Sequence, residues 1–206
     1  MNKLSLMSND DSVEKQKLKI IQRYYPEKYI TISNLPNEYV HYLSDIHNFI
    51  VFVLHKFITK QRIEKMLIDI EFEDDLHSKT GFLGNCIWED KHYRPNEFTI
   101  QIDSNLNIKN MFNTLAHEMT HVIQWAKGDF YEVVSKSNGQ DKVYKYKGKE
   151  YKSNKMSYLD KPWEVEAFGR SFTLILQWCD KYELEYFSFI PEELLSHDQL
   201  QEYITR

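Results

Sequence analysis

Residues 113–125 read NTLAHEMTHVIQW and contain an H-E-x-x-H pattern made by His117, Glu118 and His121. The other residues of the stretch are uncharged, as is typical of a helix that enters a protein core. Its apolar residues recur every three or four positions and form one stripe of a helix, whereas His117 and His121 project together from the opposite side. The stretch therefore predicts a helix whose two histidines line the wall of a cleft.

The H-E-x-x-H pattern has a specific chemical use. Neutral imidazoles at positions i and i+4 of a helix can supply two ligands to one metal ion. Glu118, one residue on, is turned toward a metal-activated water and can take its proton as a general base. We therefore expect His117 and His121 to bind one Zn²⁺ per chain, with Glu118 as the catalytic residue. The alternative, an incidental histidine pair on a helix surface, is disfavoured because no lysine or further glutamate surrounds the pair.

A catalytic zinc ion of this type needs a third protein ligand and one open position. The extended motif H-E-x-x-H-x-x-G-x-x-H is excluded, because Gln124 and Lys127 stand where glycine and histidine are required. His197 is the only histidine further along the chain, and it lies in a polar segment, SHDQLQE. His197 is therefore a poor candidate for the third ligand.

A second motif lies in residues 160–172, DKPWEVEAFGRSF, where E-V-E-A occupies 164–167. This stretch resembles the gluzincins, in which a downstream helix presents a glutamate as third zinc ligand, commonly within E-x-x-A. It is also similar to the ImmA/IrrE-type peptidases and to small zinc peptidases of phages and bacteria. The resemblance covers residues 66–178 and implies that Glu164 completes the zinc site. The order of sheet and helix resembles the SprT-like group as well, although those proteins use a third histidine.

Helical spacing distinguishes the two glutamates of this motif. Glu164 heads an apolar stripe that packs inward, where an unpaired carboxylate would be costly without a metal ion. Glu166 lies on a polar face with Arg170, at the spacing of an ordinary surface ion pair. Among the gluzincins that this stretch resembles, thermolysin-like enzymes carry an aspartate four residues after the ligand glutamate, which orients a zinc-bound histidine. Phe168 stands there in this sequence, so the resemblance implies that another residue takes that role. The candidates are Asp160 and Glu166.

The remaining segments predict an α+β, zincin-like fold. Alternation and β-branched residues indicate strands at 66–73, 82–89 and 97–103. Periodicity, Gly128 and the prolines indicate helices at 37–62 and 107–128, another from Pro162 and a short one after Pro191. We expect a small mixed sheet packed on the H-E-x-x-H helix and on a second helix that carries the glutamate ligand. Residues 1–12 are expected to be a flexible polar tail, and 13–206 a single domain.

Composition and charge limit the classes of protein to consider. The chain has 206 residues, 42% of them hydrophobic and 28% charged, which is typical of a folded domain rather than a disordered or fibrous chain. The formal net charge of -5 argues against a surface devoted to nucleic acid. No apolar run matches a signal peptide or a membrane span. We expect a cytoplasmic monomer that acts on a protein or peptide and does not contact a membrane.

Residues 142–155 alternate tyrosines with lysines around Gly148 and predict a hairpin with one aromatic and one basic face. Contact with nucleic acid through this hairpin is a less favoured alternative, which would suit a peptidase directed to DNA-bound proteins. Another alternative is a zincin-fold regulator that binds a partner and cleaves little, although the presence of Glu118 disfavours it. The candidates for a transition-state donor are Tyr144, Tyr146, Tyr151 and Tyr158.

Three further expectations concern single features. The strand at 97–103 is expected to bind an extended peptide along its edge, where unpaired backbone groups can accept a substrate strand. The two distant cysteines, Cys86 and Cys179, rule out a C-x-x-C motif and are expected to be buried free thiols. No catalytic role is expected for the histidines of the helix at 37–62, which form no i, i+4 pair: His41, His47 and His55.

Overall fold

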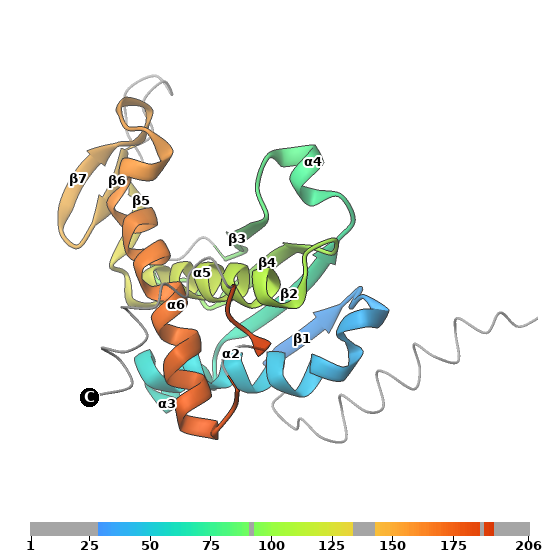
Figure 1. Ribbon diagram of the computed structural model, residues 1–206. Coiled ribbons are helices and arrows are strands. Elements are labelled where there is room, and N and C mark those ends of the chain that lie inside the picture. The colour runs from blue at the N-terminus through green and yellow to red at the C-terminus, as the bar shows by residue number, and fades with distance from the viewer. Residues whose placement is uncertain (1–28, 91–92, 134–142, 186–187, 192–206) are drawn as a thin grey trace, which may run out of the picture.

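The structure of the chain is a computed structural model, shown in Figure 1. It describes residues 29–90, 93–133, 143–185 and 188–191. The tail expected at 1–12, the candidate His197 and the helix expected after Pro191 lie outside the described residues. In the described part of the chain, no helix is long and apolar enough to cross a membrane.

Short elements make up the first part of the described chain. They are β1 (Ile30–Ser33), the 3-10 helix η1 (Asn37–Tyr42), α2 (Leu43–Phe57), α3 (Lys60–Ile63), β2 (Leu67–Glu73), α4 (Leu76–Thr80), β3 (Gly84–Trp88) and β4 (Glu97–Asp103). Two long helices dominate the rest. The later elements are α5 (Ile108–Lys127), β5 (Phe130–Val133), β6 (Val143–Tyr146), β7 (Lys149–Lys152), the 3-10 helices η2 (Ser153–Lys155) and η3 (Tyr158–Asp160), and α6 (Pro162–Tyr182).

The main sheet has the strand order β1-β2-β4-β3. β1, β2 and β4 run parallel, and β3 pairs antiparallel with β4. The expected α+β class with a small mixed sheet is thus confirmed, and the three expected strands correspond to β2, β3 and β4. The sequence did not predict β1, because its four residues, ITIS, are too few to show an alternating pattern.

One expectation about the sheet is wrong. The strand at 97–103, which is β4, lies between β2 and β3 and pairs with both, so it has no free edge for a peptide. The outer strand on this side is β3, which folds back against β4 and packs beside α5. Spatial order differs here from chain order, because β4 inserts between two strands that precede it.

The single helix expected at 37–62 is also wrong in its extent, because the chain forms three helices there. A 3-10 turn, η1, precedes α2, and α2 ends at Phe57. Ile58 and Thr59 both have extended backbone, with ψ near 140° and 147°, before α3 begins. The apolar pattern runs through this break because Ile58 remains buried in the core.

The H-E-x-x-H helix, α5, begins and ends where the sequence indicates. The side chain of Asn107 accepts a hydrogen bond from the backbone N–H of Asn110 at 2.9 Å, which caps the first turn. Gly128 ends the helix in the left-handed conformation, with φ of 71°. α6 likewise starts at the expected residue, with Pro162 in its first turn.

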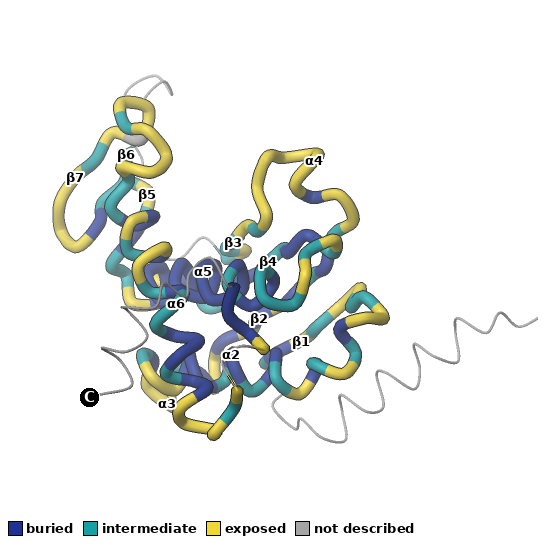
Figure 2. Tube along the Cα trace, viewed as in Figure 1, coloured by how far each residue is buried: buried dark blue, intermediate teal, exposed yellow. Residues whose placement is uncertain are grey.

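The core fixes α5 against α6. α5 packs against β3 and β4, against α2 and, over its largest contact, against α6 (Figure 1). Phe112 of α5 stacks on Trp178 of α6 with ring centroids 5.4 Å apart, and Phe49 of α2 meets both rings edge-on. Figure 2 shows α5 buried along most of its length. This packing fixes the position of α5 relative to α6, although the two helices are distant in sequence.

A second sheet, with the order β5-β6-β7, packs on Trp163 at the start of α6. β6 and β7 form the expected hairpin, and its turn residues Lys147 and Gly148 both have positive φ, of 46° and 82°. The aromatic face of the hairpin packs on Trp163, whose ring centroid lies 5.6–6.2 Å from the rings of Tyr144, Tyr146 and Tyr151. β5, again only four residues long, was not predicted.

Candidate metal centre

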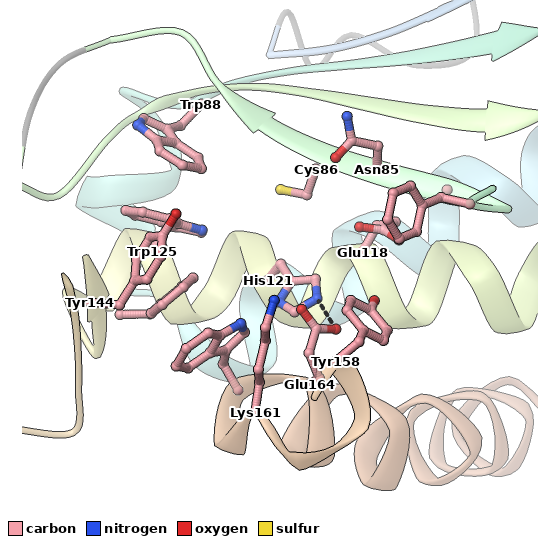
Figure 3. Close-up of a pocket in the computed structure, with 14 residues that line it drawn as sticks. Asn85, Cys86, Trp88, Glu118, His121, Trp125, Tyr144, Tyr158, Lys161 and Glu164 are labelled. Carbon is pink, nitrogen blue, oxygen red and sulfur yellow. Dashed lines mark ion pairs between the residues drawn. The ribbon is translucent and has the colours of Figure 1, made fainter. Parts of the chain in front are cut away.

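α5 and α6 bring together three side chains that the sequence singled out. The Nε2 atoms of His117 and His121 lie 3.2 Å apart. Oε2 of Glu164 lies 3.3 Å from each of these nitrogens. Among the described residues, His117, His121 and Glu164 form a group of side chains that could hold a metal ion, and all three are buried. Figure 3 shows Glu164 turned toward His121 across the gap between the two helices.

The spacing of the three atoms fits a tetrahedral metal site. Four ligands at about 2.0 Å from a tetrahedral ion are separated from one another by about 3.3 Å. Oε2 of Glu164 is fully buried, and no described group makes a hydrogen bond to it, which is costly for a carboxylate oxygen. Two imidazoles and one carboxylate form a donor set that suits Zn²⁺. The three residues therefore fit a zinc ion.

The position of Glu164 favours its ionised form. It lies in the first turn of α6, where the helix dipole stabilises a negative charge. Burial alone would raise the pKa of its carboxyl, but the imidazoles of His117 and His121 and a hydrogen bond from Tyr158 outweigh burial, so the pKa falls well below its usual range. The carboxylate is thus in the state that a metal ligand requires.

Glu118 is buried beside this group but does not belong to it. Burial raises the pKa of its carboxyl, which His121 and His117 oppose and Glu164 reinforces. Gly84 of β3 faces it closely, because a Cβ atom placed on Gly84 would lie only 2.9 Å from Oε1 of Glu118. The carboxylate is therefore confined between the edge strand and the ligand group.

Two cavities flank Glu118. The first has a volume of about 220 Å³ and is lined by Glu118, His121 and Glu164 and by five aromatic side chains. These five are Trp88, Trp125, Phe130, Tyr144 and Trp163. Figure 3 shows Trp88, Trp125 and Tyr144 at the end away from Glu118 and Glu164. The second cavity, of about 180 Å³, lies on the His117 side and includes the exposed rings of Phe82 and Phe168. Both cavities include Glu118 and Tyr158, so the two cavities adjoin the candidate metal centre, one on the His121 side and one on the His117 side.

The residue that orients His121 is Gln124, which the sequence reasoning missed. Its Nε2 donates to the backbone carbonyl of Trp163 at 2.9 Å and to Oε2 of Glu166 at 3.1 Å, which fixes the orientation of the amide. Its Oε1 then accepts from Nδ1 of His121 at 2.9 Å, leaving the Nε2 lone pair free for a metal. The three-residue spacing from His121 is the sequence signal that could have revealed it.

Of the two candidates for this role, Glu166 acts through Gln124 and Asp160 does not contact the site. Asp160 is exposed and accepts a hydrogen bond from Ser157. The expected ion pair of Glu166 with Arg170 is present at 2.8 Å. The Glu166 side chain is only 15% exposed, however, so this is not an ordinary surface ion pair. Burial raises the pKa of Glu166, yet hydrogen bonds from Tyr146, Lys147 and Gln124, together with Arg170, lower it to about 2.

Among the four candidate tyrosines, only Tyr158 is hydrogen-bonded at the centre. Partial burial and its hydrogen bond to Glu164 raise the pKa of Tyr158. Tyr144 belongs to the aromatic end of the first cavity. Tyr146 donates to Glu166, and Tyr151 packs on Trp163. Their main roles are thus in the packing of the hairpin.

The other residues considered from the sequence lie outside the group. Among the described histidines, His47 is buried in α2 and His41 and His55 are exposed. Cys179 is a buried free thiol as expected, whereas Cys86 is only partly buried and lines the first cavity. Burial raises the pKa of both thiols.

The basic face of the hairpin is partly neutralised. Lys147 pairs with Glu166 at 3.0 Å, and Lys145 lies opposite Glu150 in the strand register. Lys142 lies outside the described residues.

Comparisons with protein families, with curated proteins and with solved structures find no significant match to this chain.

Proposed function

We propose that this chain is a zinc-dependent metallopeptidase with a zincin-like fold of the gluzincin type. His117, His121 and Glu164 bind one zinc ion, and Glu118 is the catalytic general base. The substrate is a protein or peptide that enters the cleft beside β3. The outer edge of β3 pairs with no other strand among the described residues and can pair with an extended chain.

The main support for this proposal is the position of Glu118 beside the three candidate ligands. Three buried ligand atoms form a triangle with sides of 3.2–3.3 Å, and a buried carboxylate that is not a ligand lies beside them in an open cleft. A structural metal site has no need of Glu118, and a buried carboxylate outside the ligand set is costly to keep. Its position therefore favours catalysis over metal storage or scaffolding.

The position of each residue suggests its chemical role. A bound zinc ion would polarise the substrate carbonyl and make a water molecule more acidic. Glu118 takes a proton from the attacking water and delivers it to the nitrogen of the leaving peptide. The amide C–N bond breaks, the oxygen of water joins the carbonyl carbon, and the proton completes the new amine. Tyr158 lines both cavities and is the candidate hydrogen-bond donor to the carbonyl oxygen. Its single hydroxyl proton, which it donates to Glu164 in this structure, would have to turn toward the substrate for that role.

The proposal is tested by incubating the zinc-loaded chain with a broad peptide library and identifying the products by mass spectrometry. We expect cleavage that a chelator abolishes and that added zinc restores. Zinc binding without cleavage of any peptide would contradict the peptidase function and favour the regulator alternative.

Gly84 offers a test of how Glu118 is positioned. A methyl group at this position would meet Cγ2 of Thr114 at 2.5 Å and the carboxylate of Glu118 at 2.9 Å, so the strand or these two side chains must move apart. We expect Gly84→Ala to reduce kcat at least about tenfold, because small displacements of a catalytic group are costly. Zinc content should not change, since Glu118 is not a ligand.

The matched control for this substitution is Gly169→Ala. Gly169 lies in α6, and nothing is within 4 Å of a Cβ atom placed there. Peptide hydrolysis and zinc content are measured for both variants. Equal kcat for Gly84→Ala and wild type would show that β3 does not confine the base.

A further inference from the structure

The first cavity beside the metal centre has two distinct ends. Trp88 and Trp125 lie at the end away from Glu118 and Glu164 (Figure 3), and ring contacts continue from Trp125 through Phe130 to Trp163 as one aromatic wall. Trp88 and Trp125 stack with centroids 3.7 Å apart, and Phe130 stacks on Trp163 at 4.6 Å. Trp125, Phe130 and Trp163 are almost fully buried, so this wall is held rigidly by its own packing. Flat aromatic faces of this kind bind the apolar part of a ligand.

Lys161 supplies the cationic group of this cavity. It is the residue just before α6, and its side chain extends from the start of the helix into the cavity (Figure 3). Its Nζ lies 5.4 Å from the ring centroid of Tyr158, which donates to Glu164. The ammonium group is therefore close to the ligand set but is not part of it.

Lys161 is not neutralised by the carboxylates of the site. Among the described residues, no carboxylate lies within ion-pair distance of its Nζ, although Glu118 and Glu164 line the same cavity. By contrast, Lys127 and Lys147 are both paired with carboxylates. The two charges of a zinc ion balance Glu118 and Glu164, so the ammonium of Lys161 leaves the cavity with a net positive charge.

We infer that this cavity binds a substrate residue that carries a carboxylate, with Lys161 pairing the carboxylate and the aromatic wall holding the apolar part of the residue. The inference rests on the proposed function and names the substrate class of the same site. The carboxylate is either the C-terminus of a peptide or an aspartate or glutamate side chain. A free C-terminus in this cavity would make the enzyme a carboxypeptidase.

Binding measurements separate this inference from catalysis. The zinc-loaded Glu118→Gln chain is titrated by calorimetry with an N-acetylated hexapeptide that ends in phenylalanine, as the free acid and as the amide. A second pair, both amidated, ends in aspartate or asparagine. We expect one carboxylate peptide to bind about tenfold more tightly than its neutral partner, the effect of one charge-assisted hydrogen bond. Preference within the first pair identifies a C-terminus, and preference within the second identifies an acidic side chain.

The same titrations are repeated with Lys161→Met and with Lys149→Met added to the chain. Lys149 is exposed on β7 and does not line the cavity, so its substitution changes the net charge equally. The preference should disappear in Lys161→Met alone. Its persistence in Lys161→Met, or equal binding within both pairs, overturns the inference while leaving the peptidase function intact. If no peptide binds to the zinc-loaded chain, the inference and the proposed function both fail.

Discussion

Glu118→Gln is expected to reduce peptide hydrolysis by about three orders of magnitude or more while zinc remains bound. Glutamine has nearly the same shape as glutamate but cannot accept the proton of the attacking water. The proposed ligand atoms belong to His117, His121 and Glu164, so replacing Glu118 leaves those atoms in place. Loss of a buried carboxylate that has no ligand role should not destabilise the fold.

Three measurements on Glu118→Gln check this expectation: the rate of cleavage of a validated peptide, the zinc content and the melting temperature. Glu150→Gln, on the exposed face of β7, is the matched control and should behave as wild type. A Glu118→Gln chain that cleaves as fast as wild type would contradict the role of Glu118 as the base. Loss of zinc together with activity would instead make Glu118 a ligand.

Glu164→Ala is expected to weaken zinc binding by at least about tenfold and to abolish hydrolysis. The substitution removes one of three protein ligands and leaves His117 and His121 without their shared partner. Glu166→Ala should have a smaller effect on the metal, because Glu166 contacts Gln124 and not the ligand triangle. It should still slow hydrolysis, since the Gln124 amide that orients His121 loses one of its two acceptors.

The two glutamates lie two residues apart in the first turns of α6, so each variant serves as the control for the other. Zinc affinity is measured by competition with a chelator of known affinity, and folding is checked by circular dichroism. Retention of zinc by Glu164→Ala with loss by Glu166→Ala would show that the wrong glutamate has been assigned as a ligand.

Local periodicity explains why the histidines and both long helices could be predicted. The positions i and i+4 of a helix share a face whatever the rest of the fold does, so His117 and His121 had to be close if α5 formed. Asn107 and Gly128 are local capping signals, and they set the ends of α5 correctly. Glu164 was implied by the resemblance to the gluzincins, and the apolar stripe of α6 distinguished it from Glu166. The structure buries its side chain next to α5.

Features that depend on contacts between distant segments could not be predicted in this way. The position of β4 inside the sheet is set by pairing with β2 and β3, which no local pattern encodes. The aromatic wall joins Trp88 of β3 to Trp125 of α5 and to Trp163 of α6, three residues far apart in the chain. Gln124 had a local signal, its spacing from His121, but its partner in α6 became visible only in the structure.

The metal content of the purified chain tests whether His117, His121 and Glu164 form a zinc site. The chain is purified without added metal or chelator, and elemental analysis is combined with zinc titration near neutral pH. The ligand triangle predicts about one zinc ion per chain, and substitution of both His117 and His121 by alanine should remove it. A folded wild-type chain that carries no zinc and takes up none on titration would contradict the assignment of His117, His121 and Glu164 as a zinc site.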